Sequence, residues 1–120
     1  MGRMDHVVQA GPMLLNDGVA VNPDEGFSKS TVWMKHPRTF VGYDGDRLWW
    51  VVVDGRNPWH SMGLTLEETR RLAANLGLTS ALNMDGGGSS TLWWHGVVAN
   101  APSGGQERMI PYGVGFGRQP

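Results

Sequence analysis

The chain has 120 residues, of which 40% are hydrophobic and 18% are charged, and its formal net charge is −1. These figures indicate one compact domain, and they exclude an intrinsically disordered chain and a nucleic-acid-binding protein that relies on bulk positive charge. The sequence has no cysteine, which excludes disulfides and thiolate metal sites. It also has no apolar run near the roughly 20 residues that cross a bilayer, and no signal-peptide pattern. We therefore expect a cytoplasmic protein without a membrane or nucleic-acid partner.

Short strands separated by turn residues make up most of the predicted secondary structure. They are expected at residues 6–10, 13–15, 19–21, 39–43, 47–53, 80–84, 91–95, 97–99 and 112–116. Asn16-Asp17-Gly18 has the composition of a hairpin turn, and residues 22–30 and 57–63 are predicted loops. Because side chains alternate along a strand, one ring of each pair Trp49/Trp50 and Trp93/Trp94 should face the core.

One amphipathic helix is predicted over residues 66–76, from Leu66 to Leu76. Thr65 and Glu68 have the spacing of a capping box, and Gly77 suits the left-handed residue that ends a helix. Residues at helical spacing should face the sheet, namely Leu66, Thr69, Leu72, Ala73 and Leu76. The solvated face should hold Glu67, Glu68, Arg70 and Arg71.

The helix joins two strands that each lead into an aspartate. A strand–helix–strand crossover normally makes its two strands parallel, so Asp54 and Asp85 should leave the sheet at one edge. Their carboxylates would be about 5 Å apart on neighbouring strands, or about 10 Å apart with one strand between them. Both separations suit the two-carboxylate chemistry of sugar hydrolysis. The predicted fold is α+β, a mixed sheet with one main helix in a strand–helix–strand unit.

The run Gly86, Gly87 and Gly88 predicts an anion-binding loop, because successive glycines leave backbone N–H groups open to a ligand. Further donors are expected from Ser89, Ser90, Thr91, Arg38 and Arg56. A carboxylate repels a bound phosphate, so Asp85 should donate a proton, hold a divalent cation or bind sugar hydroxyls. The run is not a P-loop, because GK[ST] is absent. The four histidines show no metal-ligand spacing, and most of them are expected at the surface.

Several segments together resemble the phosphodiester glycosidase family. The most specific is ALNMDGGGSSTLWWHGVVANAPSGGQER at 81–108, supported by GPMLLNDG at 11–18, HPRTFVGYDGDRLWWVVVDGR at 36–56, GLTLEETRRLAANLG at 63–77 and YGVGF at 112–116. The resemblance implies hydrolysis of the glycosidic bond of a sugar-1-phosphodiester, with N-acetylglucosamine as the expected sugar. It implies one domain over residues 1–120 that lacks the family's usual N-terminal portion.

The resemblance also implies the site residues. The candidate catalytic carboxylates are Asp54, Asp85 and Glu107, with no individual role as nucleophile, acid or base assigned to any of them. The candidate substrate-binding residues are Arg38, Arg56, Gly86, Gly87, Gly88, Ser89, Ser90, Thr91, Asn100, Ser103 and Arg108.

Two other interpretations stay open. Without that N-terminal portion, the same pocket would bind a phosphorylated sugar or nucleotide-like ligand without cleaving it, as a small phage sequestering protein would. Alternatively, the six tryptophans and the strand edges would serve assembly of a structural subunit. We expect a homo-oligomer in any case, because an abbreviated sheet leaves an edge that needs cover.

Overall fold

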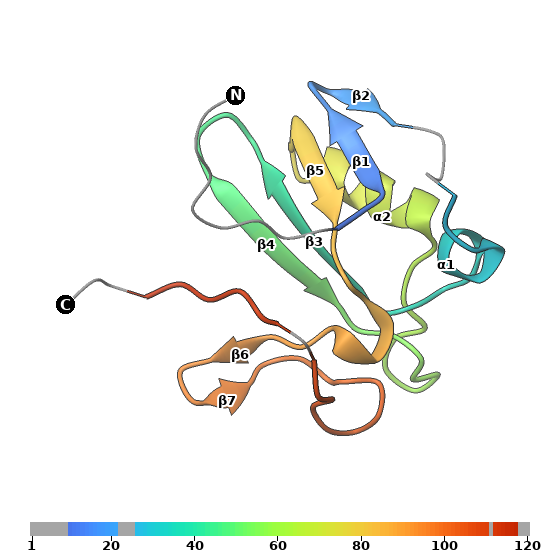
Figure 1. Cartoon of the computed structure of the whole chain (residues 1–120), viewed down its shortest axis with the longest axis vertical. Coiled ribbons are helices and arrows are strands. Elements are labelled where there is room, and N and C mark those ends of the chain that lie inside the picture. Colours follow the sequence, from blue (N-terminus) through green and yellow to red (C-terminus); the bar gives the residue numbers. More distant parts are fainter. Residues whose placement is uncertain (1–9, 22–25, 111, 118–120) are drawn as a thin grey trace.

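The computed structural model describes residues 10–21, 26–110 and 112–117. Its centre is a five-stranded sheet with the strand order β2-β1-β5-β3-β4 (Figure 1). The strands are β1 (Met13–Asn16), β2 (Val19–Ala20), β3 (Arg38–Tyr43), β4 (Leu48–Val53) and β5 (Ser80–Asn83). A separate hairpin below this sheet consists of β6 (Trp93–Trp94) and β7 (Val97–Val98).

The two strands that lead into the aspartates run in the same direction. β3 lies between β4 and β5 and is antiparallel to both, and α2 (Leu66–Asn75) connects β4 to β5. The α+β class and the strand–helix–strand unit are thereby confirmed, although every hydrogen-bonded pair in the described sheet is antiparallel. Asp54 and Asp85 therefore follow strands that end at one edge of the sheet and have one strand between them.

The helix α2 begins as its sequence predicts. Thr65 Oγ1 accepts a hydrogen bond from the Glu68 amide at 3.1 Å, and Glu68 Oε1 accepts one from the Thr65 amide at 3.0 Å. Gly77 follows with φ of +84°, as expected for a left-handed helix end. The core lies between the helix and one face of the sheet, and its buried apolar residues are Leu14, Leu15, Phe40, Leu66, Ala73, Leu78 and Ala81.

Three predictions about the helices and the last strand are wrong. Arg70 is 7% exposed and not solvated, because its Nε donates to the Leu14 carbonyl at 3.1 Å. Part of the predicted loop at 22–30 is a short helix, α1 (Lys29–Trp33), which Ser28 caps through its hydroxyl. Residues 112–116 form no strand, since Gly113 and Gly115 provide no side chains to pack. The predicted strand at 6–10 lies outside the described residues except for Ala10.

Only one of the two tryptophan pairs shows the expected alternation between the core and the opposite face. Trp49 packs against the core. The Trp50 and Phe116 rings lie edge to face, with their centroids 5.5 Å apart. Trp93 and Trp94 are both exposed, so the expectation is wrong for this pair. No helix in the described part of the chain is long and apolar enough to span a membrane.

The burial of two leucines predicts different effects of their substitution on stability. Leu66 is 1% exposed in α2, whereas Leu48 is 57% exposed at the start of β4. We expect Leu66→Ala to lower the free energy of unfolding by about 2–5 kcal/mol, because it leaves a cavity, and Leu48→Ala to change it by at most about 0.5 kcal/mol. Equilibrium urea unfolding measures both, and equal losses would contradict this assignment of the core.

Candidate functional site

A cavity of about 600 Å³ opens where β5 leads into the glycine run. We call it the glycine-loop cavity. Its wall combines the 83–88 segment with residues that precede β3, follow β4 and lie near the C-terminus. The wall residues that bear on its chemistry are His36, Arg38, Arg56, Asn83, Asp85, Gly86, Gly87, Gly88 and Arg108.

Two of the glycines allow guanidinium groups to lie directly against the backbone. A Cβ on Gly87 would be 2.8 Å from Arg56 Nη2, and a Cβ on Gly88 would be 2.9 Å from Arg108 Nη1. Gly87 also has φ of +59°, a region that L residues rarely adopt. Any side chain at these two positions would therefore displace a cation from the cavity wall.

The backbone amides of the glycine run are largely engaged within the protein. The Gly86 amide donates to Asp85 Oδ1 at 3.0 Å, and the Gly87 amide donates to the Pro37 carbonyl at 2.9 Å. The Ser89 and Ser90 amides close the short helix η1 (Gly87–Ser89). The side chains of Arg56 and Arg108 would therefore provide most of the positive charge that an anion in this cavity contacts.

Both guanidinium groups are oriented by neighbours. Arg56 Nη2 donates to His36 Nδ1 at 3.1 Å, and His36 Nε2 lies 2.8 Å from the Ser30 carbonyl. Because a carbonyl only accepts and a guanidinium only donates, these contacts correspond to the His36 tautomer with its hydrogen on Nε2. Arg108 Nη2 donates to the Ser89 hydroxyl. The cavity thus presents two oriented forked cations, which suits a phosphate group.

Arg38 lines the same cavity, but its side chain holds the surrounding chain together. It is 3% exposed, and it donates to the carbonyls of Leu64, Thr31 and Met34 at 2.9, 2.6 and 3.1 Å. Burial, together with the nearby charge of Arg56, lowers the pKa of its guanidinium. Arg38 therefore links α1 and the segment before α2 to β3.

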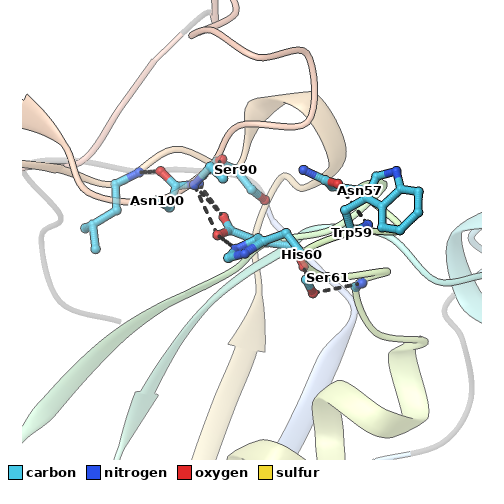
Figure 2. Close-up of polar contacts among 10 residues, drawn as sticks. Asn57, Trp59, His60, Ser61, Ser90 and Asn100 are labelled. Atoms are coloured by element: carbon cyan, nitrogen blue, oxygen red, sulfur yellow. Dashed lines mark hydrogen bonds and ion pairs between the residues drawn. The ribbon is translucent and has the colours of Figure 1, made fainter.

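Asp54 is the centre of a polar network at the end of β4. Its carboxylate oxygens lie 2.9 Å from His60 Nε2, 2.9 Å from Asn100 Nδ2, and 3.0 and 3.1 Å from the Ala101 amide nitrogen. Figure 2 shows His60 and Asn100 converging on this network from separate loops, while Trp59 points away from it. Burial alone would raise the pKa of Asp54, but the hydrogen bonds from His60, Ala101 and Asn100 outweigh it, so the pKa is lowered.

The two aspartates differ in what their carboxylates contact. Asp85 is exposed, lines the glycine-loop cavity, and accepts a hydrogen bond from the adjacent Gly86 amide. Asp54 does not line this cavity, and its oxygens are occupied by side-chain and backbone donors. Of the two, Asp85 is the carboxylate available to a ligand.

The other predicted site residues are distributed around these groups. Ser90 is buried and accepts from the Thr39 hydroxyl at 2.9 Å, and Thr91 lines a small cavity beside Trp50. Asn100, Ser103 and Glu107 line a second cavity of about 690 Å³. This second cavity has residues 56–58 on one side and residues 100–107 on the other, and Arg56 lines both cavities.

Sequence reasoning missed three residues of these networks. His36 and His60 were not singled out among the four histidines, and no spacing in the sequence links them to Arg56 or Asp54. Asn83 is 5% exposed and lines the glycine-loop cavity, with its Nδ2 donating to the Gly11 carbonyl at 3.2 Å. Its Oδ1 has no hydrogen-bond partner within the described structure. The sequence signal for Asn83 was a polar residue at an inward-facing position of a predicted strand.

Within the described ranges, no group of three or more His, Asp or Glu residues forms a candidate metal site.

Comparison with known proteins decides the family. A family model for phosphodiester glycosidases matches residues 2–117. The chain belongs to the phosphodiester glycosidase family. The family resemblance carried by the 81–108 segment and the shorter motifs is thereby confirmed.

Two relatives of the chain are considerably longer than the chain itself. The N-acetylglucosamine-1-phosphodiester alpha-N-acetylglucosaminidase of Mus musculus is 32% identical over 103 residues, 81% of this chain and 19% of the mouse protein. An uncharacterized SPbeta prophage-derived protein of Bacillus subtilis is 35% identical over 88 residues, 69% of this chain and 14% of its own length. The chain therefore spans about a fifth or less of these two relatives.

A solved structure shares the fold. The catalytic domain of the zebrafish N-acetylglucosamine-1-phosphodiester alpha-N-acetylglucosaminidase, auto-inhibited by its pro-peptide, superposes with a TM-score of 0.68 at 26% identity. The match covers 80% of this chain and 34% of the zebrafish chain.

The lowered pKa of Asp54 predicts a pH dependence of stability. Because its folded pKa lies below the value of about 3.9 in an unfolded chain, the carboxylate stabilises the fold above that pH, and this stabilisation is lost as pH falls through the folded pKa. From about pH 5 down to about pH 2, we expect the free energy of unfolding to fall more steeply for wild type than for Asp54→Asn. Urea unfolding at a series of pH values measures the slopes. Asp17→Asn, in an exposed turn, is the control for loss of one carboxylate. A wild-type slope for Asp54→Asn would refute the prediction.

The packing of Arg108 against Gly88 predicts a loss of anion affinity. We expect Gly88→Ala to weaken binding of inorganic phosphate about tenfold, because the new methyl group displaces the guanidinium. A Cβ on Gly115 would meet nothing within 4 Å, so Gly115→Ala is the matched control. NMR titration with phosphate measures both, and an unchanged affinity of Gly88→Ala would argue against Arg108 as an anion ligand.

Proposed function

We propose that this chain hydrolyses the glycosidic bond of a sugar-1-phosphodiester in the glycine-loop cavity. One observation carries the proposal: Arg56 and Arg108 lie against Gly87 and Gly88 in the cavity that Asp85 also lines. An anion site beside an available carboxylate is the arrangement that a phosphate-linked sugar requires. Family membership supports this reaction class, and the name of the mouse relative supports N-acetylglucosamine as the sugar.

The reaction breaks the bond between the anomeric carbon and the bridging oxygen. That oxygen stays on the phosphate, so the products are the free sugar and a phosphate monoester of the second alcohol. Water supplies the hydroxyl group of the sugar, and its other proton passes to the monoester or to solvent. The guanidinium groups of Arg56 and Arg108 stabilise the negative charge that develops on the departing phosphate.

In this proposal Asp85 acts at the anomeric carbon. Positive charge develops there in the transition state, and an ionised carboxylate stabilises it. Asp85 then either attacks the carbon or takes the proton from the attacking water. Asp54 serves as a positioning residue, because its bonds to His60, Asn100 and Ala101 fix the loops around the site.

Substitution of Asp85 tests the proposal. We expect Asp85→Asn to lower kcat at least about 100-fold for release of N-acetylglucosamine from its methyl 1-phosphodiester, with an unchanged thermal midpoint. The side chain is exposed and bonds only to its neighbouring amide among the described residues, so the fold does not depend on it. Asp46→Asn, in the exposed β3–β4 turn, is the control for loss of one negative charge.

The same assay separates catalysis from sequestration. If folded wild-type protein binds the diester and returns it intact, the chain is a non-catalytic binding protein for a phosphorylated sugar, and the hydrolase proposal is wrong. If Asp85→Asn hydrolyses the diester at the wild-type rate, another group performs the chemistry.

A further inference from the structure

The short helix α1 lies against the glycine-loop cavity, and Phe27, Ser30 and Thr31 from this part of the chain line it. A helix of only five residues is not stable by itself, so its position depends on contacts with the rest of the protein. The buried Arg38 side chain supplies two of these contacts, because it donates to the Thr31 and Met34 carbonyls. Hydrogen bonds from β3 therefore hold α1 in place as part of the cavity wall.

The backbone beside Phe27 is also fixed locally. The next residue, Ser28, caps α1: its hydroxyl accepts a hydrogen bond from the Thr31 amide at 3.2 Å, and its carbonyl accepts one from the Val32 amide at 3.1 Å. Val32 in turn packs against the core. The phenyl ring of Phe27 is nevertheless 41% exposed. An apolar ring that is exposed on a fixed backbone can be covered by a ligand at little cost in main-chain entropy.

The wall of the glycine-loop cavity contains both charged and apolar groups. Arg56 and Arg108 lie against Gly87 and Gly88 and supply positive charge. The apolar part of the wall comes from Ala10, Phe27, Pro37, Met84 and the ring of Tyr112. Phe27 has the largest of these side chains that carries no polar atom. A wall of this composition suits a ligand that combines an anionic group with an apolar surface.

A sugar linked to phosphate has both features. A pyranose ring carries its hydroxyls around its edge and C–H groups on its faces, and such a face can pack flat on an aromatic ring. The cavity volume of about 600 Å³ is sufficient for a sugar together with a phosphate. With the phosphate at Arg56 and Arg108, the attached sugar has to occupy another part of the cavity, whose wall includes Phe27.

We propose that Phe27 is a specificity-determining residue that stacks on the C–H face of the sugar ring. The inference rests on the proposed function, which places a sugar in this cavity. Stacking of this kind selects a pyranose over an acyclic substituent on the phosphate. It does not involve the acetamido group, so Phe27 contributes equally to the binding of glucose and of N-acetylglucosamine.

The test uses C-glycosidic phosphonates, in which a methylene group replaces the bridging oxygen and prevents hydrolysis. The probes are the phosphonate methyl esters of N-acetylglucosamine and of glucose, and methyl methylphosphonate as a ring-free ester of the same charge. We expect wild type to bind both sugar phosphonates at least about tenfold more tightly than the ring-free ester. Removal of about 60 Å² of apolar surface from water corresponds to a factor of this size.

The variants are Phe27→Ala, Phe27→Tyr and Trp33→Ala. We expect Phe27→Ala to lower the affinity ratio of sugar phosphonate to ring-free ester about tenfold for both sugars, and Phe27→Tyr to keep the wild-type ratio because the aromatic ring remains. Trp33 is 70% exposed in α1 and does not line the cavity, so Trp33→Ala is the matched control with an unchanged ratio. In NMR titrations, the Phe27 ring should move the sugar C–H resonances to higher field with wild type but not with Phe27→Ala.

The outcomes separate this inference from the proposed function. If Phe27→Ala prefers the sugar phosphonates by the wild-type factor, with the same shifts of the sugar resonances, Phe27 does not contact the sugar and the hydrolase proposal stands. A reduced ratio for N-acetylglucosamine alone would assign Phe27 to the acetamido group and overturn stacking on the ring. If wild type itself binds the sugar phosphonates no more tightly than the ring-free ester, the cavity does not recognise a sugar, and the hydrolase proposal fails together with this inference.

Discussion

The bonds of the Asp54 carboxylate tie together the part of the molecule where ligands would bind. This side chain leaves β4 and holds His60 on one loop and Asn100 and Ala101 on another, more than forty positions away in the sequence. A partly buried carboxylate with several donors is strongly held, because each charge-assisted hydrogen bond offsets the loss of hydration. The wall of the second cavity that contains Asn100 and Ala101 depends on this one group.

The glycines beside this network have a specific packing role. Gly87 and Gly88 leave room for two guanidinium groups, so cationic side chains contact the main chain where a Cβ would otherwise lie. Arg56 reaches this position from a left-handed backbone, and His36 accepts a hydrogen bond from it. Positive charge is therefore concentrated on the cavity wall although the whole chain has a net charge of −1.

Local patterns in the sequence were sufficient to predict most of the fold. The capping box of Thr65 and Glu68, the turn at Asp17 and the parallel direction of β4 and β5 depend on neighbouring residues or on a general rule of chain crossover, and all three are observed. The intervening strand β3 had to be seen in the structure, because periodicity does not specify which strands pair. The burial of Arg70 depends on a carbonyl 56 positions away, which no local pattern encodes.

The candidate site likewise has residues that the sequence could locate and contacts between distant segments that it could not predict. The sequence located Arg56, Asp85 and the glycine run, because their residue types are unusual at the end of a strand. The sequence did not show that the Asp54 carboxylate is occupied by hydrogen bonds while the Asp85 carboxylate is open to a ligand. That difference depends on which loops fold over each carboxylate. The contacts of His36 and His60 likewise arise only when distant segments meet.

Asn83 gives the floor of the glycine-loop cavity a chemical preference. Its amide nitrogen is committed to Gly11, whereas its amide oxygen is buried without a donor in the described structure. A buried acceptor in this condition is unfavourable, so a ligand hydroxyl that reaches it gains more than the same hydroxyl gains in water. Under the proposed function, a sugar hydroxyl placed against Asn83 would satisfy this oxygen, and a deoxy analogue would leave it without a donor.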